Sequence, residues 1–210
     1  MNILDFFYKA DLWVLHYLNV KSHDPILDQY WLQITQLHKA PWFLLGVLPV
    51  LILIGLYYCR WELVKVVLAL TISVSASDFI AYRWIKQLVQ RPRPFDNPEI
   101  ADWLRKVGQA HGSSFPSNHA ANVFAGAVIL AWYFPGARYL FYAFAFLVTI
   151  SRPILGVHYP SDVLAGAFLG FFVGTLVIAF ILNRVKWFWI KRFVSQGDDF
   201  SGNWRKRFDQ

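Results

Sequence analysis

Long apolar runs separated by short polar stretches dominate this chain of 210 residues. An α-helix needs about 20 predominantly apolar residues to cross the hydrocarbon of a bilayer, and several runs reach or approach that length. These predicted spans are Pro41–Cys59, Trp61–Tyr82, His119–Phe134, Arg138–Ile154 and Asp162–Leu182. The pattern therefore predicts an all-α fold, an integral membrane helical bundle with five to six transmembrane helices.

The first forty residues follow a different pattern, in which charged and polar residues interrupt two apolar runs at helical spacing. Asp5 and Asp11 interrupt the first run, and Asp28 interrupts the second. Apolar residues opposite such charges are typical of amphipathic helices that lie in the membrane interface. We therefore expect N-terminal interfacial amphipathic helices over residues 1–40, and a sixth span at Ile3–Val20 is the alternative.

The composition supports membrane insertion. Hydrophobic residues make up 57% of the chain and charged residues only 16%, and ten Trp suit the boundary between headgroups and hydrocarbon. The single cysteine, Cys59, excludes an internal disulfide and a cysteine-built metal site. The net charge of +7 comes from basic residues that lie between apolar runs or in a basic, aromatic tail over residues 183–210. That distribution indicates anionic lipid headgroups as partners and argues against nucleic acid.

Polar residues that are unusual in a membrane protein fall at four points, which spans of alternating direction would bring to one membrane face. They are Lys86, Arg93, Ser117, His119, Ser151, Arg152, His158 and Asp162. Taken singly, a Lys or Arg near a helix end usually extends to the headgroups, and Asp162 could simply cap a helix. Their joint occurrence on one face predicts a functional site.

The residue types in this group suit a phosphate, which needs several cations held in fixed positions. Lys86, Arg93 and Arg152 supply three, the arginines as planar forks of donors and the lysine as a point charge. The segment before His119 enters a helix behind a proline. Free backbone N–H groups there, and the Ser117 hydroxyl, could therefore bind the same anion.

Two histidines could carry out the two proton-transfer and bond-forming roles that a phosphoryl transfer without a metal requires. One would attack phosphorus, and the other would protonate the departing oxygen. His158 is followed four residues later by Asp162, whose carboxylate could hold one ring nitrogen protonated and stabilise the positive ring after attack. His119 is then the general acid.

The three segments that carry these residues resemble the signature of the type 2 phosphatidic acid phosphatase superfamily. That signature runs Lys-x6-Arg-Pro, then Pro-Ser-Gly-His, then Ser-Arg-x5-His-x3-Asp. The corresponding segments here are residues 86–94, 116–119 and 151–162. The chain departs from the family at Asn118, where the family usually has glycine, although asparagine is the next most tolerant residue of left-handed backbone geometry.

The resemblance implies a role for each matching residue. The phosphate-binding residues would be Lys86, Arg93, Ser117, Asn118 and Arg152, and the catalytic residues would be His158 as nucleophile, His119 as general acid and Asp162 as the partner of His158. It also implies a phosphohistidine intermediate and no metal or other cofactor.

A site at the ends of membrane helices suits a headgroup whose tail stays in the bilayer, so we expect a membrane lipid phosphatase. The resemblance favours undecaprenyl diphosphate as substrate. Lipid A 1-phosphate, phosphatidylglycerol phosphate and phosphatidic acid are alternatives. Two other functions stay open, a lipid phosphotransferase and a non-enzymatic lipid carrier or flippase, the latter requiring no histidine pair.

We expect a single membrane-embedded domain over residues 1–210. It would consist of interfacial helices (1–40), a transmembrane catalytic core (41–182) and the basic tail (183–210). Because Lys and Arg concentrate on the cytoplasmic side of membrane proteins, the tail predicts a cytoplasmic C-terminus. The chain would then be a multi-pass protein of the bacterial cytoplasmic membrane, with its active site facing the periplasm or cell exterior.

Overall fold

The computed structural model describes residues 2–37, 40–41, 45–46 and 48–182, and these residues include no β-strand. The α-helices in this part of the chain are α1 (Ile3–His16), α2 (Pro25–Gln36), α3 (Leu48–Phe79), α4 (Lys86–Val89), α5 (Asn118–Tyr133), α6 (Arg138–Ile154) and α7 (Pro160–Val177). Short π-helical segments follow α1 (Tyr17–Lys21) and α7 (Ile178–Leu182), and another (Ile80–Ile85) joins α3 to α4. The predicted all-α fold is thus confirmed, while the basic tail (183–210) lies outside the described residues.

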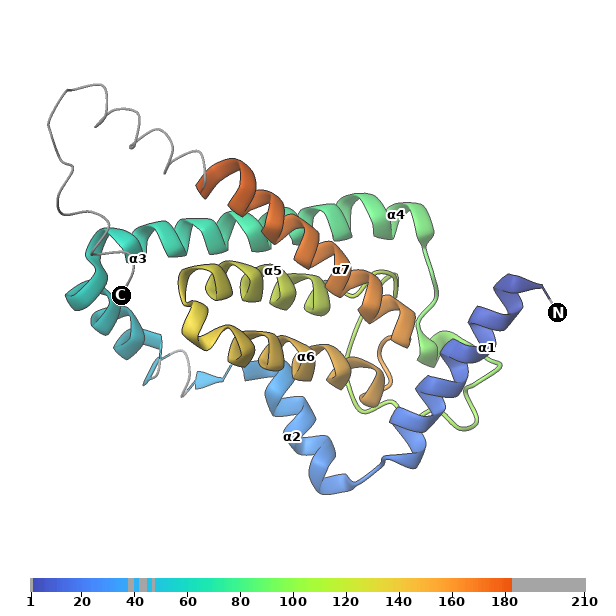
Figure 1. The fold of residues 1–210 in the computed structure, drawn as a ribbon. Coiled ribbons are helices and arrows are strands. Elements are labelled where there is room, and N and C mark those ends of the chain that lie inside the picture. Colours follow the sequence, from blue (N-terminus) through green and yellow to red (C-terminus); the bar gives the residue numbers. More distant parts are fainter. Residues whose placement is uncertain (1, 38–39, 42–44, 47, 183–210) are drawn as a thin grey trace, which may run out of the picture.

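Helix α5 lies at the centre of the bundle (Figure 1), where it packs against α3, α6 and α7. Helix α2 packs against α6, and α1 contacts α7. The π-helical segment after α1 also contacts α6. Both N-terminal helices therefore lie against the bundle, at helices that carry parts of the predicted signature.

The close packing of α5 on α7 depends on small residues. Gly170 on α7 lies so near α5 that a Cβ atom there would come within 2.0 Å of the Ala121 carbonyl oxygen. Small residues allow helix backbones to approach closely, as in membrane bundles. In addition, the Ser117 amide donates to the Asp162 carbonyl oxygen (3.0 Å). The first turns of α5 and α7 are therefore held side by side.

Helix α3 differs from the predicted span boundaries. The sequence predicts separate spans at Pro41–Cys59 and Trp61–Tyr82, but Leu48–Phe79 forms one continuous helix. The prediction that the helix is interrupted at Arg60 is therefore wrong. No glycine or proline lies next to Arg60, and a charged residue does not by itself break the backbone hydrogen bonds of a helix. Part of the first predicted span lies outside the described residues.

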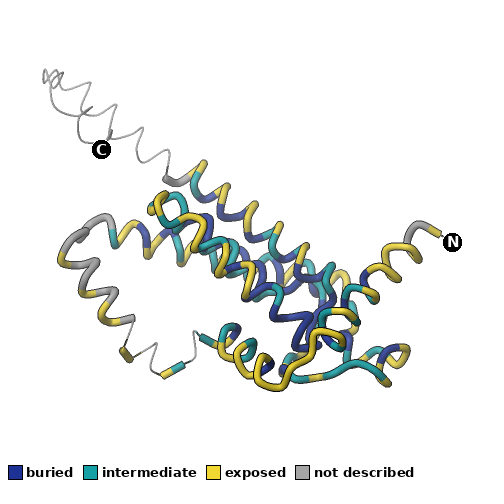
Figure 2. Tube along the Cα trace, turned by 60° about the horizontal axis from the view of Figure 1, so that its bottom comes forward, coloured by how far each residue is buried: buried dark blue, intermediate teal, exposed yellow. Residues whose placement is uncertain are grey.

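The outer surface of the bundle is rich in large apolar side chains. Figure 2 shows exposed positions recurring along the outer sides of the helices, and on α7 they include Leu164 and Phe168. Extended apolar surface marks contact with a membrane or a partner. Within the described residues, two stretches are long and apolar enough to cross a membrane, Leu63–Asp96 and Pro160–Phe180. The predicted count of five to six spans stays a prediction.

Helix α1 buries both a polar and an apolar residue against the protein. Asp11 is only 8% exposed and Leu15 is fully buried, whereas Trp13 is 70% exposed. Helix α2 likewise buries Asp28 and exposes Ile26. The predicted N-terminal helices are therefore present with apolar residues facing outward, and their location in the membrane interface stays a prediction.

Candidate active site

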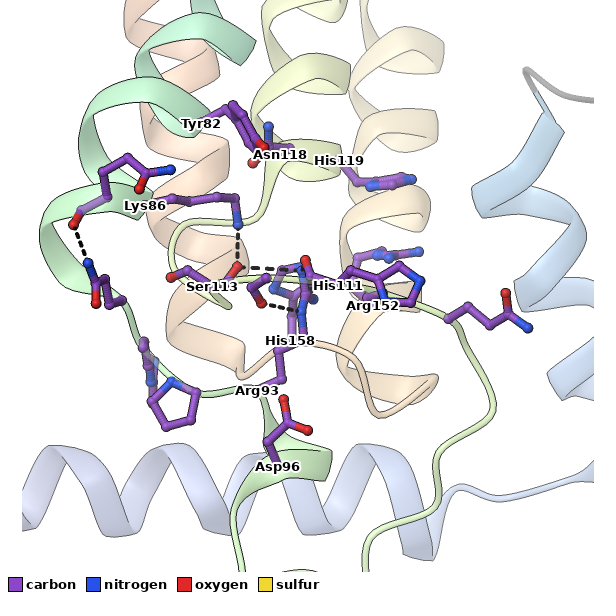
Figure 3. Close-up of a pocket in the computed structure, with 17 residues that line it drawn as sticks. Tyr82, Lys86, Arg93, Asp96, His111, Ser113, Asn118, His119, Arg152 and His158 are labelled. Carbon is purple, nitrogen blue, oxygen red and sulfur yellow. Dashed lines mark hydrogen bonds between the residues drawn. The ribbon is translucent and has the colours of Figure 1, made fainter.

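A cavity of about 650 Å³ opens where α4, the start of α5, the end of α6 and the loop before α7 meet (Figure 3). Small-molecule sites generally measure roughly 300–1,000 Å³. Six of the eight predicted site residues line this cavity, and they are Lys86, Arg93, Asn118, His119, Arg152 and His158. Most of the residues that the sequence placed on one membrane face thus meet in one cavity.

Arg93 is buried, and backbone carbonyl groups hold its guanidinium in place. Nε donates to the Gly112 carbonyl (2.9 Å), and Nη2 donates to the His111 carbonyl (2.8 Å). Nη1 donates to the Val157 carbonyl (2.9 Å) and also lies 3.2 Å from His158 Nε2. A phosphate bound to this guanidinium would therefore lie beside the imidazole of His158.

Lys86 and Arg152 are two further cations of the cavity, which Arg91 also lines. Lys86 Nζ donates to the Ser113 carbonyl (2.6 Å). Arg152 donates through Nη1 to the Thr35 hydroxyl (2.9 Å), while its buried Nε has no hydrogen-bond partner among the described residues. Buried donors normally have a partner, so Nε of Arg152 is well suited to donate a hydrogen bond to a phosphate oxygen.

His158 and Asp162 form the predicted pair at the start of α7. Asp162 Oδ2 lies 3.5 Å from His158 Nδ1 and accepts a hydrogen bond from the Tyr159 amide (2.9 Å). The carboxylate therefore both caps the helix and faces the imidazole. Ser114 Oγ donates to the same carboxylate oxygen and lies 3.4 Å from Nδ1. Nδ1 thus faces the carboxylate, which leaves Nε2 on the side of Arg93 and the cavity.

A tight turn after α6 directs His158 into the cavity. Gly156 in this turn has φ +73°, and a Cβ atom there would come within 2.2 Å of the Arg105 carbonyl oxygen, so only glycine fits. Burial lowers the pKa of His158 to about 4, against the opposing effect of Asp162. The imidazole is therefore neutral near pH 7, as a nucleophile must be.

Two predicted phosphate ligands occupy different environments. Ser117 is fully buried and caps α5, where its Oγ accepts from the Ala120 amide (3.5 Å). Asn118 lines the cavity and donates to Asp78 Oδ1 (2.7 Å) on α3. As the first residue of α5, Asn118 has ordinary helical geometry, so its backbone does not require the glycine found in the family.

Four residues outside the predicted set surround it, and they are Asp11, Thr35, Arg91 and Ser114. Arg91 Nη1 donates to Asp162 Oδ1 (2.7 Å), and Nη2 donates to Asp11 Oδ2 (2.8 Å). The position of Asp11, an acidic residue inside an apolar run, indicated that it could have a special role. That position does not identify its partner Arg91, which lies 80 residues away in the chain.

Sequence comparison assigns the chain to a family. The sequence pattern that defines the PAP2 superfamily matches residues 62–186, which is more than half of the chain. The chain therefore belongs to the PAP2 superfamily, and this confirms the resemblance inferred from the three-part signature.

Several phosphatases are similar to this chain. A lipid A 4'-phosphatase of Bacteroides thetaiotaomicron is 33% identical over 181 residues, which cover 83% of this chain and 78% of that protein. A lipid A 1-phosphatase of Rhizobium etli is 37% identical over 103 residues, covering 48% of this chain and 44% of the relative. A decaprenylphosphoryl-5-phosphoribose phosphatase of Mycobacterium tuberculosis is 43% identical over 107 residues, covering 49% and 56%.

Two solved structures share the fold. The crystal structure of Aquifex aeolicus LpxE matches with a TM-score of 0.60 and 25% identity, covering 80% of this chain and 94% of that one. The transmembrane PAP2 type phosphatidylglycerolphosphate phosphatase from Bacillus subtilis matches with a TM-score of 0.57 and 26% identity, covering 92% and 89%. These matches extend the similarity beyond the signature segments to most of the helical bundle.

Proposed function

We propose that this protein is a membrane lipid phosphatase in which His158 takes a phosphoryl group from the lipid and water then removes it. The lipid phosphatases among its relatives, together with its family, confirm the predicted enzyme class. The observation that carries the proposed mechanism is the His158–Asp162 pair, whose histidine lines the same cavity as the predicted phosphate-binding cations Lys86, Arg93 and Arg152.

In the proposed complex, phosphate oxygens take over donors that now bind backbone carbonyls. Lys86 and Arg93 donate to carbonyls of residues 111–113. An anionic phosphate is a stronger acceptor than a neutral carbonyl, because charge-assisted hydrogen bonds are roughly twice as strong as neutral ones. Arg152 adds a third cation, so the doubly charged phosphate is neutralised and phosphorus lies beside Nε2 of His158.

The chemistry then proceeds in two steps. In the first, Nε2 of His158 attacks phosphorus, the bond from phosphorus to the lipid oxygen breaks, and His119 gives its proton to that oxygen. Asp162 holds the proton on Nδ1 and stabilises the positive ring. In the second, water attacks the phosphohistidine and gives a proton to the now neutral His119. Inorganic phosphate leaves, and both histidines return to their starting states.

For the substrate, we propose a phosphorylated lipid, with lipid A phosphate as the first candidate. The alignment with a lipid A 4'-phosphatase spans 83% of this chain and supports that choice. Undecaprenyl diphosphate, which the sequence favoured, has no specific support from the relatives described above. It stays a second candidate, together with phosphatidylglycerol phosphate and phosphatidic acid.

We further propose that the active site faces the outer side of the bacterial cytoplasmic membrane. The basic tail, by its composition, supports a cytoplasmic C-terminus. A reporter that is active only in the cytoplasm, fused after Gln210, should be active. An inactive cytoplasmic fusion together with an active exported one would reverse the orientation.

Phosphate release from detergent-solubilised protein tests the proposed function. The protein should release phosphate from a lipid phosphate in the presence of EDTA, and His158→Ala should reduce release by roughly 10³-fold or more. With a lipid substrate that carries a radiolabelled phosphate, an acid-sensitive label from the phosphohistidine should stay on the unaltered protein after a rapid quench. The same label should be absent from His158→Ala. Unchanged release by His158→Ala would overturn the mechanism. A panel of lipid A, undecaprenyl diphosphate and phosphatidylglycerol phosphate identifies the preferred substrate.

A further inference from the structure

Arg91 lies between two carboxylates that come from opposite ends of the chain. Its Nη1 donates to Asp162 Oδ1 (2.7 Å), on the oxygen that does not face His158. Its Nη2 donates to Asp11 Oδ2 (2.8 Å), on α1. The guanidinium also lies over the Tyr159 ring, 3.8 Å from its centroid. Arg91 is thus fixed in position, and it contacts the carboxylate that supports the proposed nucleophile.

Asp11 is itself held by the first turn of α7. Its Oδ1 accepts from the Ser161 amide (2.8 Å), and its Oδ2 accepts from the Ser161 hydroxyl (2.6 Å). Arg91 Nη1 also donates to that hydroxyl (2.7 Å). These contacts leave Asp11 only 8% exposed. A buried carboxylate with this set of partners has one well-defined position.

The charges of the three groups explain what Asp11 contributes. A guanidinium bound to Asp162 alone would draw that carboxylate toward itself and compensate much of its negative charge. Asp162 would then stabilise a positive imidazole on His158 less well. Because Arg91 is shared with Asp11, more of the negative charge of Asp162 is left for His158, and Oδ2 stays directed at Nδ1.

We propose that Asp11 is a positioning residue for the catalytic pair, acting through Arg91. The proposal rests on the proposed function, because it assigns to Asp11 an effect on the step in which His158 becomes positive. Asp11 lies outside residues 62–186, the segment matched by the family. In this proposal, helix α1 supports the active site from outside the family-matched segment.

Asp11→Asn tests this role, because it removes the charge and keeps the size of the side chain. We expect kcat to fall about tenfold to a hundredfold with KM changed less than about threefold, since the phosphate-binding residues are untouched. Formation of the radiolabelled phosphohistidine after rapid mixing should slow by the same factor. Asp5→Asn, on the exposed side of the same helix, is the matched control and should leave both quantities unchanged.

A double-mutant cycle with Arg91→Gln separates positioning from simple attachment of α1. If Asp11 acts through the charge of Arg91, Asp11→Asn should change kcat less than about twofold in the Arg91→Gln background. An equally large loss in that background would overturn the proposal, because the Ser161 contacts alone would then explain the effect. Protection of Asp11→Asn against thermal unfolding by inorganic phosphate should match that of the unaltered protein, because the residues that line the cavity are unchanged in this variant.

Two further variants keep the test decisive if Asp11→Asn does not fold. Arg91→Lys keeps the positive charge but has no fork to bridge both carboxylates, so it should lower kcat by a larger factor than it changes KM. Asp11→Glu keeps the negative charge and should retain more activity than Asp11→Asn. If the unaltered protein hydrolyses lipid phosphate but Asp11→Asn behaves like Asp5→Asn, only this proposal fails. If the unaltered protein hydrolyses none, the proposed function fails as well.

Discussion

The family-matched segment and the two N-terminal helices meet at the same site but contribute different things to it. Residues 62–186 carry the whole three-part signature, and their side chains line the cavity. Helices α1 and α2 carry none of it, yet Asp11 binds Arg91, and Thr35 accepts a hydrogen bond from Arg152. The first region supplies the reacting and charged groups, while the second fixes the orientation of two arginines.

The two regions also differ in how they treat polar residues. In the matched segment, the polar groups gather around a cavity that a substrate can enter. In α1 and α2, Asp11 and Thr35 are buried against the bundle, while Trp13 and Ile26 are exposed. Both helices therefore bury polar groups that contact arginines of the site, while other residues on them, which are apolar, stay exposed.

The largest expected effect of a single carboxylate belongs to the matched segment. Asp162→Asn should lower kcat roughly 10³-fold or more, because the amide cannot stabilise a positive His158 ring and can reverse its tautomer. This loss, measured as initial phosphate release, should exceed that of Asp11→Asn. The contrast between reacting and positioning regions breaks down if Asp11→Asn is the more damaging of the two.

A smaller effect is expected from Thr35 on α2. Thr35→Val keeps the shape of the side chain and removes the oxygen that accepts from Arg152 Nη1, leaving a buried charged donor without that partner. Loss of one such bond should raise KM for the lipid phosphate by about threefold to thirtyfold, with a smaller change in kcat.

Thr71→Val provides the control for this variant. Thr71 is an exposed threonine on α3 whose hydroxyl donates only locally, to the Val67 carbonyl (2.8 Å). Kinetic constants of Thr71→Val should equal those of the unaltered protein. Equal constants for Thr35→Val would show that α2 does not influence phosphate binding.

The smallest expected effect concerns pH. A histidine with a pKa of about 4 is still mostly neutral at pH 5, so the nucleophile is lost only as the pH falls toward 4. With an ordinary pKa near 6.5, only about 3% of the imidazole would be neutral at pH 5. We therefore expect protonation of His158 to change kcat/KM less than about twofold between pH 6.5 and 5, once the values are corrected for ionisation of the substrate phosphate.

An acidic limb near pH 6.5 in that corrected profile would contradict the burial of His158. The same profile sharpens the comparison of the two regions. Asp11→Asn weakens the support that Asp162 gives to the positive ring, so the acidic limb should stay at or below its original pH. A limb that moves upward in this variant would mean that Asp11 destabilises the charged imidazole.

Much of the fold and of the site could be predicted, because the relevant signals are local in the chain. His158 and Asp162 are four residues apart, and a proline between them starts a helix, so their encounter depends on one helical turn. Apolar runs predicted the helices for a similar reason. The boundary at Arg60 was wrong, because hydropathy falls at charged residues whether or not the backbone helix ends there.

The role of Ser117 shows a limit of the signature. Its sequence context placed it at the helix entrance, where a hydroxyl can either bind an anion or cap the helix. In the structure the hydroxyl caps α5 and is fully buried. Which of the two partners a hydroxyl takes depends on its direction, and residue spacing does not contain that information.

The sequence by itself determined the class of chemistry, because the residue types and their spacings specify a cationic phosphate pocket with a histidine pair. Only the tertiary structure decided which polar residues support that pocket. The bonds from Arg91 to Asp11 and from Arg152 to Thr35 join positions 80 and 117 residues apart. Contacts at such separations arise from the packing of α1 and α2 on the bundle. Neither helical periodicity nor a local motif can specify them, since each describes only neighbours along the chain.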